Sequence, residues 1–209
     1  MHKEYSMEVL MSNYELKARA REQLKDRYWM VFVVVLIVLA VSGASYPLIV
    51  GLIVVGPLTV GLSYYLLDIV QTNHKGDNYE LLIEGFKKSL VASIVSNLLT
   101  MIFIFLWSLL LIIPGIIKAL SYSMTPYIIA DNPEIDGMVA IDKSREMMRG
   151  NKTRLFFLYF SFIGWFILCL FTFGIGFFFL APYIKTTVAN FYVDIRGSKR
   201  VLVADFSKD

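Results

Sequence analysis

The sequence predicts an all-α membrane protein, a six-transmembrane-helix bundle built from three helical hairpin repeats, each preceded by a cytoplasmic amphipathic helix. The chain is 57% hydrophobic and only 18% charged, whereas about a quarter of a soluble domain is charged. The apolar residues form long blocks instead of one helical stripe, which suits lipid on all sides. Asp68, Asp131 and Asp194 close such blocks at equal spacing. This spacing predicts a triplicated hairpin.

The predicted spans follow from the thickness of the hydrocarbon core, which about 20 helical residues cross. They are expected near residues 28–45, 48–70, 90–112, 114–130, 154–173 and 177–195. The fourth contains Lys118, two serines and Pro126, so it should lie inside the bundle with a kink. A five-span or re-entrant arrangement is the alternative.

The whole chain, 1–209, is predicted to be one integral membrane domain. The repeats run approximately over 12–70, 77–131 and 132–195, and 196–209 is a cytoplasmic tail. Each repeat should open on a short charged helix, and the third of these helices should stop at Gly150. The expected caps are Ser12 with Glu15, Asp77 with Glu80, and Asn132 followed by Pro133 and Glu134.

Basic residues gather at one side of this six-span arrangement. They precede the first, third and fifth spans and follow the sixth, whereas the opposite connections near 42–47, 114–115 and 173–176 carry no charge. The positive-inside rule therefore predicts that both termini are cytoplasmic.

Several motifs carry a resemblance to a known family. The run PGIIKALSY at 114–122 is followed by YIIADNP at 127–133. Further matches follow in order: MMRGNK at 147–152, FIGW at 162–165, GIG at 174–176, APY at 181–183 and FY at 191–192. In these motifs the chain resembles the bacterial integral membrane family catalogued as domain of unknown function 975, from about 13 to 195. It more distantly resembles the membrane domain of some glycerophosphodiester phosphodiesterases.

The resemblance implies a multi-pass protein of the bacterial plasma membrane, and it brings no established activity and no catalytic residues with it. The chemistry must therefore be read from the residues themselves.

Two lysines stand inside predicted spans, shortly after prolines in two of the repeats. Lys118 and Lys185 are candidates for binding an anionic ligand or lipid, together with Tyr122 and Tyr183. A lysine at mid-bilayer costs about 2.5–3.5 kcal/mol on insertion scales, so it needs a partner or an interface. The alternative is that both lysines snorkel to headgroups or bond a neighbouring hydroxyl.

A second set of candidates consists of basic residues that could contact the inner leaflet: Arg19, Arg21, Lys143, Arg149, Lys152 and Arg154. The alternative is that they only satisfy the positive-inside rule. The three aspartates are expected to be solvated at cytoplasmic helix ends, with Asp131 helping to cap the helix that follows.

Enzymatic and nucleic-acid-binding functions fit the sequence poorly. His2 and His74 have no partner at metal-ligand or triad spacing, and Cys169 is the single cysteine. No catalytic residue, metal site or cofactor is therefore expected, and a net charge of only +3 argues against nucleic acid.

The sequence favours a non-enzymatic scaffold that binds lipid or another membrane protein, of an envelope stress or immunity type. The alternative is a small transporter or flippase for an anionic or lipidic substrate. A transporter would need a polar, solvent-reachable cavity containing Lys118 and Lys185, whereas a scaffold needs only a closed bundle with a basic inner face.

Overall fold

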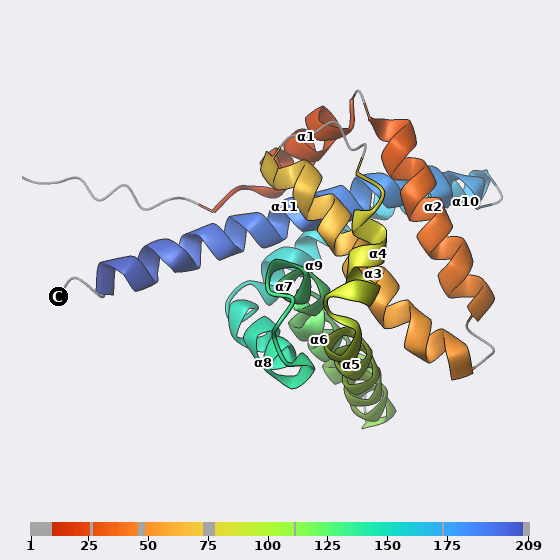
Figure 1. Cartoon of the computed structure of the whole chain (residues 1–209). Helices are drawn as coiled ribbons and strands as arrows, with labels where there is room; N and C mark the ends of the chain where they lie inside the picture. The colour runs from red at the N-terminus through yellow and green to blue at the C-terminus, as the bar shows by residue number, and fades with distance from the viewer. Residues whose placement is uncertain are drawn as a thin grey trace, which may run out of the picture.

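The computed structural model describes residues 10–206 except 26, 46–48, 73–77, 111 and 173, and this part of the chain forms eleven helices and no strand. Figure 1 shows the long helix α11 crossing the bundle and running out of it toward the C-terminus. The helices are α1 (Asn13–Leu24), α2 (Tyr28–Ser45), α3 (Ile49–Thr72), α4 (Leu81–Lys87), α5 (Leu90–Leu110), α6 (Ile112–Tyr122), α7 (Thr125–Asp131), α8 (Gly137–Met147), α9 (Lys152–Phe160), α10 (Ile163–Phe171) and α11 (Ile175–Phe206).

The first three predicted spans correspond to α2, α3 and α5, but the fourth and fifth are each divided. The kink expected in the fourth is present, because Pro126 stands in the first turn of α7 after the break from α6. The break between α9 and α10 was not expected. There the hydroxyl of Ser161 bonds the carbonyl of Leu158 at 2.6 Å, and the Lys17 ammonium donates to the carbonyl of Ser161 at 2.9 Å. The sixth helix continues beyond its predicted end at 195.

Four segments of the described chain are long and apolar enough to cross a membrane: Val54–Gln71, Leu90–Leu109, Ile112–Asp131 and Lys152–Cys169. The apolar stretch Tyr28–Ser42 is shorter. Large apolar side chains cover the outside of α5 and α10, with Leu109 74% and Phe171 80% exposed. An exposed apolar surface of this kind belongs against lipid, so the structure is that of a helical membrane protein.

The three predicted caps have different outcomes. The capping box of Ser12 and Glu15 is confirmed: the Ser12 hydroxyl accepts from the Glu15 N–H, and the Glu15 carboxylate accepts from the Ser12 N–H. Asp77, predicted to cap the second helix, lies outside the described residues. The prediction of Asn132 was wrong, because α8 begins later and Asp136 caps it by accepting from the Met138 N–H at 2.8 Å.

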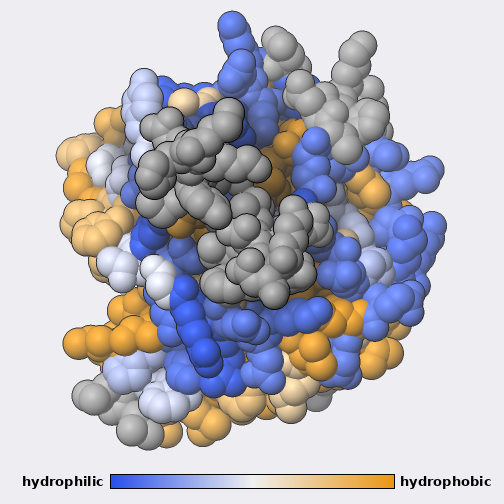
Figure 2. Space-filling view, turned by 90° about the vertical axis from the view of Figure 1, so that its left-hand side faces the viewer, coloured by the Kyte–Doolittle hydropathy of each residue, from blue (hydrophilic) through white to orange (hydrophobic). Residues whose placement is uncertain are grey.

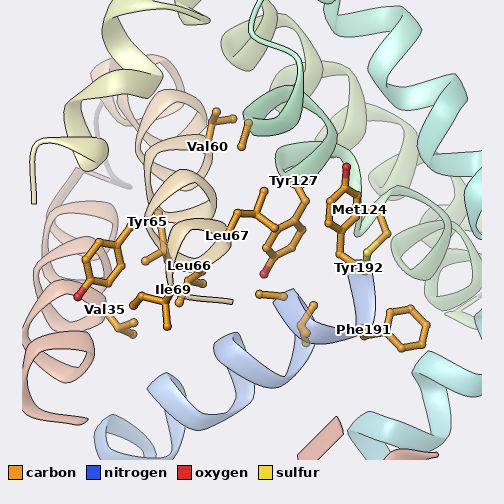
Figure 3. Close-up of a cluster of buried hydrophobic side chains, with 14 of the residues drawn as sticks. Val35, Val60, Tyr65, Leu66, Leu67, Ile69, Met124, Tyr127, Phe191 and Tyr192 are labelled. Atoms are coloured by element: carbon orange, nitrogen blue, oxygen red, sulfur yellow. The ribbon is translucent and has the colours of Figure 1, made fainter. Parts of the chain in front are cut away.

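The core is built around α3, which contacts α2, α4, α5, α7 and α11. Leu67 of this helix lies beside the aromatic ring of Tyr127 on α7, next to which stands Tyr192 on α11 (Figure 3). These two tyrosines stack with ring centroids 5.5 Å apart. Because neighbours cover α3 on several sides, its apolar residues are buried by protein packing as well as by lipid.

Small residues let α3 and α4 cross with their backbones in contact. A Cβ atom on Gly85 of α4 would overlap the carbonyl oxygen of Pro57 in α3, and one on Gly61 would overlap that of Leu82. Glycine is the residue that permits this approach. The same device joins α8 to α5, where a Cβ on Gly137 would lie 2.6 Å from the carbonyl oxygen of Ala92.

The first helix, α1, packs into the bundle instead of lying free on a surface. Its apolar stripe of Leu16, Ala20 and Leu24 is buried, and the hydroxyl of Tyr183 on α11 donates to the carbonyl of Lys17 at 3.3 Å. Hydrophilic residues gather on the side of the molecule from which α11 emerges (Figure 2). The apolar face of α1 is therefore occupied by protein, and its basic residues lie around that contact.

We expect Gly85→Ala to lower the melting temperature of the detergent-solubilised protein. The added methyl group has no space against Pro57, and overpacking of this kind typically costs about 1–3 kcal/mol. Gly164→Ala is the matched control, because no atom lies within 4 Å of the position of its Cβ. Alanine in that exposed helix should be neutral or stabilising by up to about 1 kcal/mol. Circular dichroism measures the two melting temperatures. Equal values for the two variants would contradict the close approach of α3 and α4.

Candidate functional site

A cavity of about 550 Å³ lies inside the bundle, bordered by α2, α3, α5, α6, α7, α9 and α11. This volume is in the range of small-molecule sites, which are typically about 300–1,000 Å³. One wall is apolar and comes mainly from Val35, Val38 and Leu39 of α2 with Leu62 and Leu66 of α3. The remaining wall is rich in hydroxyl and amide groups.

The polar wall is a stripe on α5. Ser93, Ser96, Asn97 and Thr100 border the cavity, and their spacing places them on one face of the helix. The hydroxyls of Ser93 and Ser96 donate to the carbonyls of residues three positions earlier, at 2.9 and 3.2 Å. Their oxygen lone pairs remain available as acceptors. A polar stripe of this period within an apolar span is visible in the sequence, and the sequence reasoning missed it.

Lys185 is the charged residue of the cavity lining. It stands in the middle of α11, between the half-buried Ile184 and the buried Thr186, yet its own side chain is accessible to solvent. Open space beside the ammonium accounts for this accessibility. Within the described part of the chain, no carboxylate lies within ion-pair distance of it.

Further polar groups border the same space from α6, α7 and α9. Tyr122, Thr125, Tyr127 and Tyr159 all belong to the lining. Thr125 is 3% exposed, and its buried hydroxyl has no hydrogen-bond partner among the described residues. An ammonium, several hydroxyls and an unpaired donor around one cavity make an environment that favours an anionic or strongly polar guest.

The structure separates the four residues that the sequence grouped as one candidate site. Lys185 and Tyr122 border the cavity, but Lys118 does not. The Lys118 ammonium instead lies over the ring of Trp107, 4.6 Å from its centroid, a cation–π contact. Tyr183 borders a different hollow, next to α1 and α10. The two lysines therefore do not hold one ligand together.

Two of the three evenly spaced aspartates are paired and not solvated, which corrects the expectation from sequence. Asp194 accepts from Arg154 at 2.5 Å, and the two side chains are 8% and 19% exposed. Asp131 accepts from Arg196 and from the hydroxyl of Tyr192, the latter at 3.1 Å. These bonds tie α11 to α9 and α7, so their first role is structural.

Most of the basic residues predicted to contact the inner leaflet are on the surface, but one is not. Arg19, Arg21, Lys143 and Arg149 are exposed, and Lys152 is half-buried. Arg154 turns inward instead, where it bonds Asp194 and the carbonyl of Met11 and covers the ring of Phe191. Arg154 is thus turned toward the protein through its Nη2 atom, which makes both bonds. Its Nη1 atom is buried and has no hydrogen-bond partner among the described residues.

The described residues offer no metal site and no accessible thiol. Cys169 is buried, and among the described residues no group of three His, Cys, Asp or Glu side chains could hold a metal ion. The cavity and the ion pairs are therefore the polar features that need a functional or structural explanation.

A family model described as "Protein of unknown function (DUF975)" matches residues 109–199. Over this segment the chain is similar to the DUF975 family. The match confirms the resemblance over α6 to α11, which include Tyr122, Lys185 and the paired aspartates. No curated protein and no solved structure matches the chain. The more distant resemblance to glycerophosphodiester phosphodiesterases gains no support from the DUF975 match, and the family description assigns no activity.

We expect Arg154→Met to destabilise the protein by about 3 kcal/mol, because it leaves the buried Asp194 carboxylate without its cation. Arg145→Met is the control. Arg145 pairs with Asp142 on the surface, where the two side chains are 51% and 63% exposed, and such a pair contributes about 0–1 kcal/mol. Thermal unfolding of both variants in the same detergent measures the difference. An equally large loss of stability in Arg145→Met would show that the buried Arg154–Asp194 pair contributes no more than the surface pair.

Proposed function

We propose that this protein is a non-enzymatic, multi-pass component of the bacterial cytoplasmic membrane, with cytoplasmic termini, that holds an anionic group in its central cavity. The observation that carries the proposal is Lys185, a cation on a cavity wall without a carboxylate partner in the described chain. A charged group inside a bundle is costly, and a bound anion would offset this cost. The anionic group is a carboxylate or phosphate, carried by a small solute or by a lipid headgroup.

The cavity supports recognition as well as charge neutralisation. Ser96, Asn97 and Thr100 on α5 lie on the lining together with Lys185 on α11, so hydroxyl and amide groups are available to a polar guest around its charged group. The apolar wall from α2 would accept a hydrophobic portion. A scaffold that acts through its surface alone has no use for this interior. Lipids and another membrane protein remain the partners that we propose for its surface.

Transport is the second candidate, and one observation favours it beyond the cavity itself. The chain has two interrupted apolar segments, α6–α7 and α9–α10. Interrupted helices beside a midplane cavity are a recurrent feature of secondary transporters. Tyr122 at the end of α6 and Tyr159 in α9 both border the cavity next to these breaks.

The ligand proposal predicts that Lys185→Ala abolishes retention of an anionic ligand, whereas Lys118→Ala leaves it intact. Both substitutions remove one lysine from an apolar region, but only Lys185 borders the cavity. The measurement is native mass spectrometry of the gently extracted full chain, first with retained lipids and then with added inorganic phosphate or acetate. Loss of a lipid adduct identifies a headgroup, and loss of the added anion identifies a solute.

Identical spectra for wild type and both lysine variants would overturn the cavity proposal. Circular dichroism of each variant separates a lost ligand from a lost fold.

Transport predicts that the cavity opens in turn to both sides of the membrane. In a Cys169→Ser background, Thr100→Cys places a thiol on the cavity wall, and Leu106→Cys, 51% exposed on the apolar outside of α5, is the control. A membrane-impermeant maleimide should label Thr100→Cys from either side of oriented vesicles and Leu106→Cys from neither. Labelling of Thr100→Cys from one side alone supports binding without transport.

A further inference from the structure

A second hollow, of about 710 Å³, runs along α1, α10 and α11. We call it the α1 groove. It borders Leu180 and Tyr183 of α11, whereas the central cavity borders Ile184 and Lys185. The groove also borders Gly176 and Phe179 and the cavity also borders Val188, so the two spaces are centred on different sides of one helix.

One edge of the α1 groove is basic. Lys17, Arg21 and Lys25 all border it, and their spacing of four residues puts them in one row along α1. No acidic residue lies on the groove lining that the structure describes. Burial, and then the charge of Arg21, lower the pKa of Lys17. The row is thus an excess of positive charge that the groove itself does not neutralise.

Lys17 is the half-buried member of this row. Its ammonium donates to the carbonyl of Ser161 at the break between α9 and α10, and it lies 4.1 Å from the centroid of the Phe162 ring. Both partners are neutral, so the positive charge remains available to an anion. Arg21 and Lys25 are exposed and can approach the same anion from solvent.

The opposite part of the α1 groove is apolar. Trp165 and Leu168 of α10 and Phe179 and Leu180 of α11 border it, and Leu168 is 56% exposed. Along α11 the lining extends from Gly176 to Tyr183, which is about 10 Å at 1.5 Å per residue. The groove thus has a row of cations on α1 and an apolar channel along α10 and α11.

We propose that the α1 groove binds one anionic phospholipid, with its phosphate at Lys17, Arg21 and Lys25 and an acyl chain along Leu168 and Leu180. The basic row matches an anionic headgroup, and the apolar channel lies on helices whose outer surface belongs against lipid. A soluble anion would make no use of this channel. The site is separate from the central cavity, and the inference does not depend on the function proposed for Lys185.

The test compares Arg21→Gln with Arg19→Gln in the full chain. Both arginines are exposed on α1, but only Arg21 borders the groove. The solubilised protein is equilibrated with equal amounts of phosphatidylglycerol and phosphatidylethanolamine, and native mass spectrometry counts the retained lipids. We expect wild type to retain phosphatidylglycerol selectively. Arg21→Gln should weaken this retention about fivefold, the effect of about 1 kcal/mol per cation near an anionic lipid, and Arg19→Gln should not.

A second pair of variants tests the acyl channel. Leu168→Gln should reduce phosphatidylglycerol retention severalfold, whereas Ile167→Gln should not, because Ile167 is similarly exposed but does not border the groove. Glycerol 3-phosphate, which carries the phosphate without an acyl chain, should compete poorly. Retention in the Lys185→Ala variant should be unchanged, which separates this site from the cavity.

Equal losses for Arg21→Gln and Arg19→Gln would overturn the inference, as would equal retention of the two lipids by wild type. Efficient displacement by glycerol 3-phosphate would show a headgroup site only and would also overturn it.

Discussion

The close crossing of α3 and α4 is the constraint on which the other helix positions depend. Gly61 and Gly85 leave no side chain between the two backbones, and α3 also contacts α2, α5, α7 and α11. In a bilayer, association of this kind relies on van der Waals contact and not on expulsion of water from apolar surfaces. Once α3 is fixed, α5 must face it, and the serine stripe of α5 turns inward. The cavity forms where α6, α7 and α11 complete the ring around that stripe.

Charged side chains of the interior fall into two groups, those in buried ion pairs and those that border the two hollows. At the end of α7 and along the later turns of α11, Asp131 and Asp194 each hold an arginine. These pairs neutralise the carboxylates and orient the long helix. The cations that border the two hollows have no such partner within the described chain: Lys185 in the cavity, and Lys17 with Arg21 beside the α1 groove. The buried ion pairs thus hold helices together, and the cations that border the hollows are those for which we propose ligands.

Much of the helix layout could be predicted from sequence, because apolar block length and capping chemistry are local properties. The bounds of α2 and the capping box at Ser12 are examples. The break after Phe160 was not predicted, and the contact that the Lys17 ammonium makes with the carbonyl of Ser161 there joins residues distant in sequence. Corresponding positions after two prolines made Lys118 and Lys185 look equivalent, yet Trp107 holds the first and the cavity borders the second. The polar face of α5 was available as a periodic pattern, whereas its opposition to Lys185 required the tertiary structure.

The position of α11 as a partition between the two hollows has a further consequence. Tyr183 borders the α1 groove and Lys185 borders the cavity, and side chains two residues apart on a helix point in directions about 160° apart. A small roll of α11 about its own axis would therefore change both spaces together. If the ligands of the two hollows favour different rotations of α11, each ligand will change the protein's affinity for the other by the same factor, because such coupling is reciprocal. The composition of the surrounding membrane would then act on the interior of the bundle as an allosteric effector.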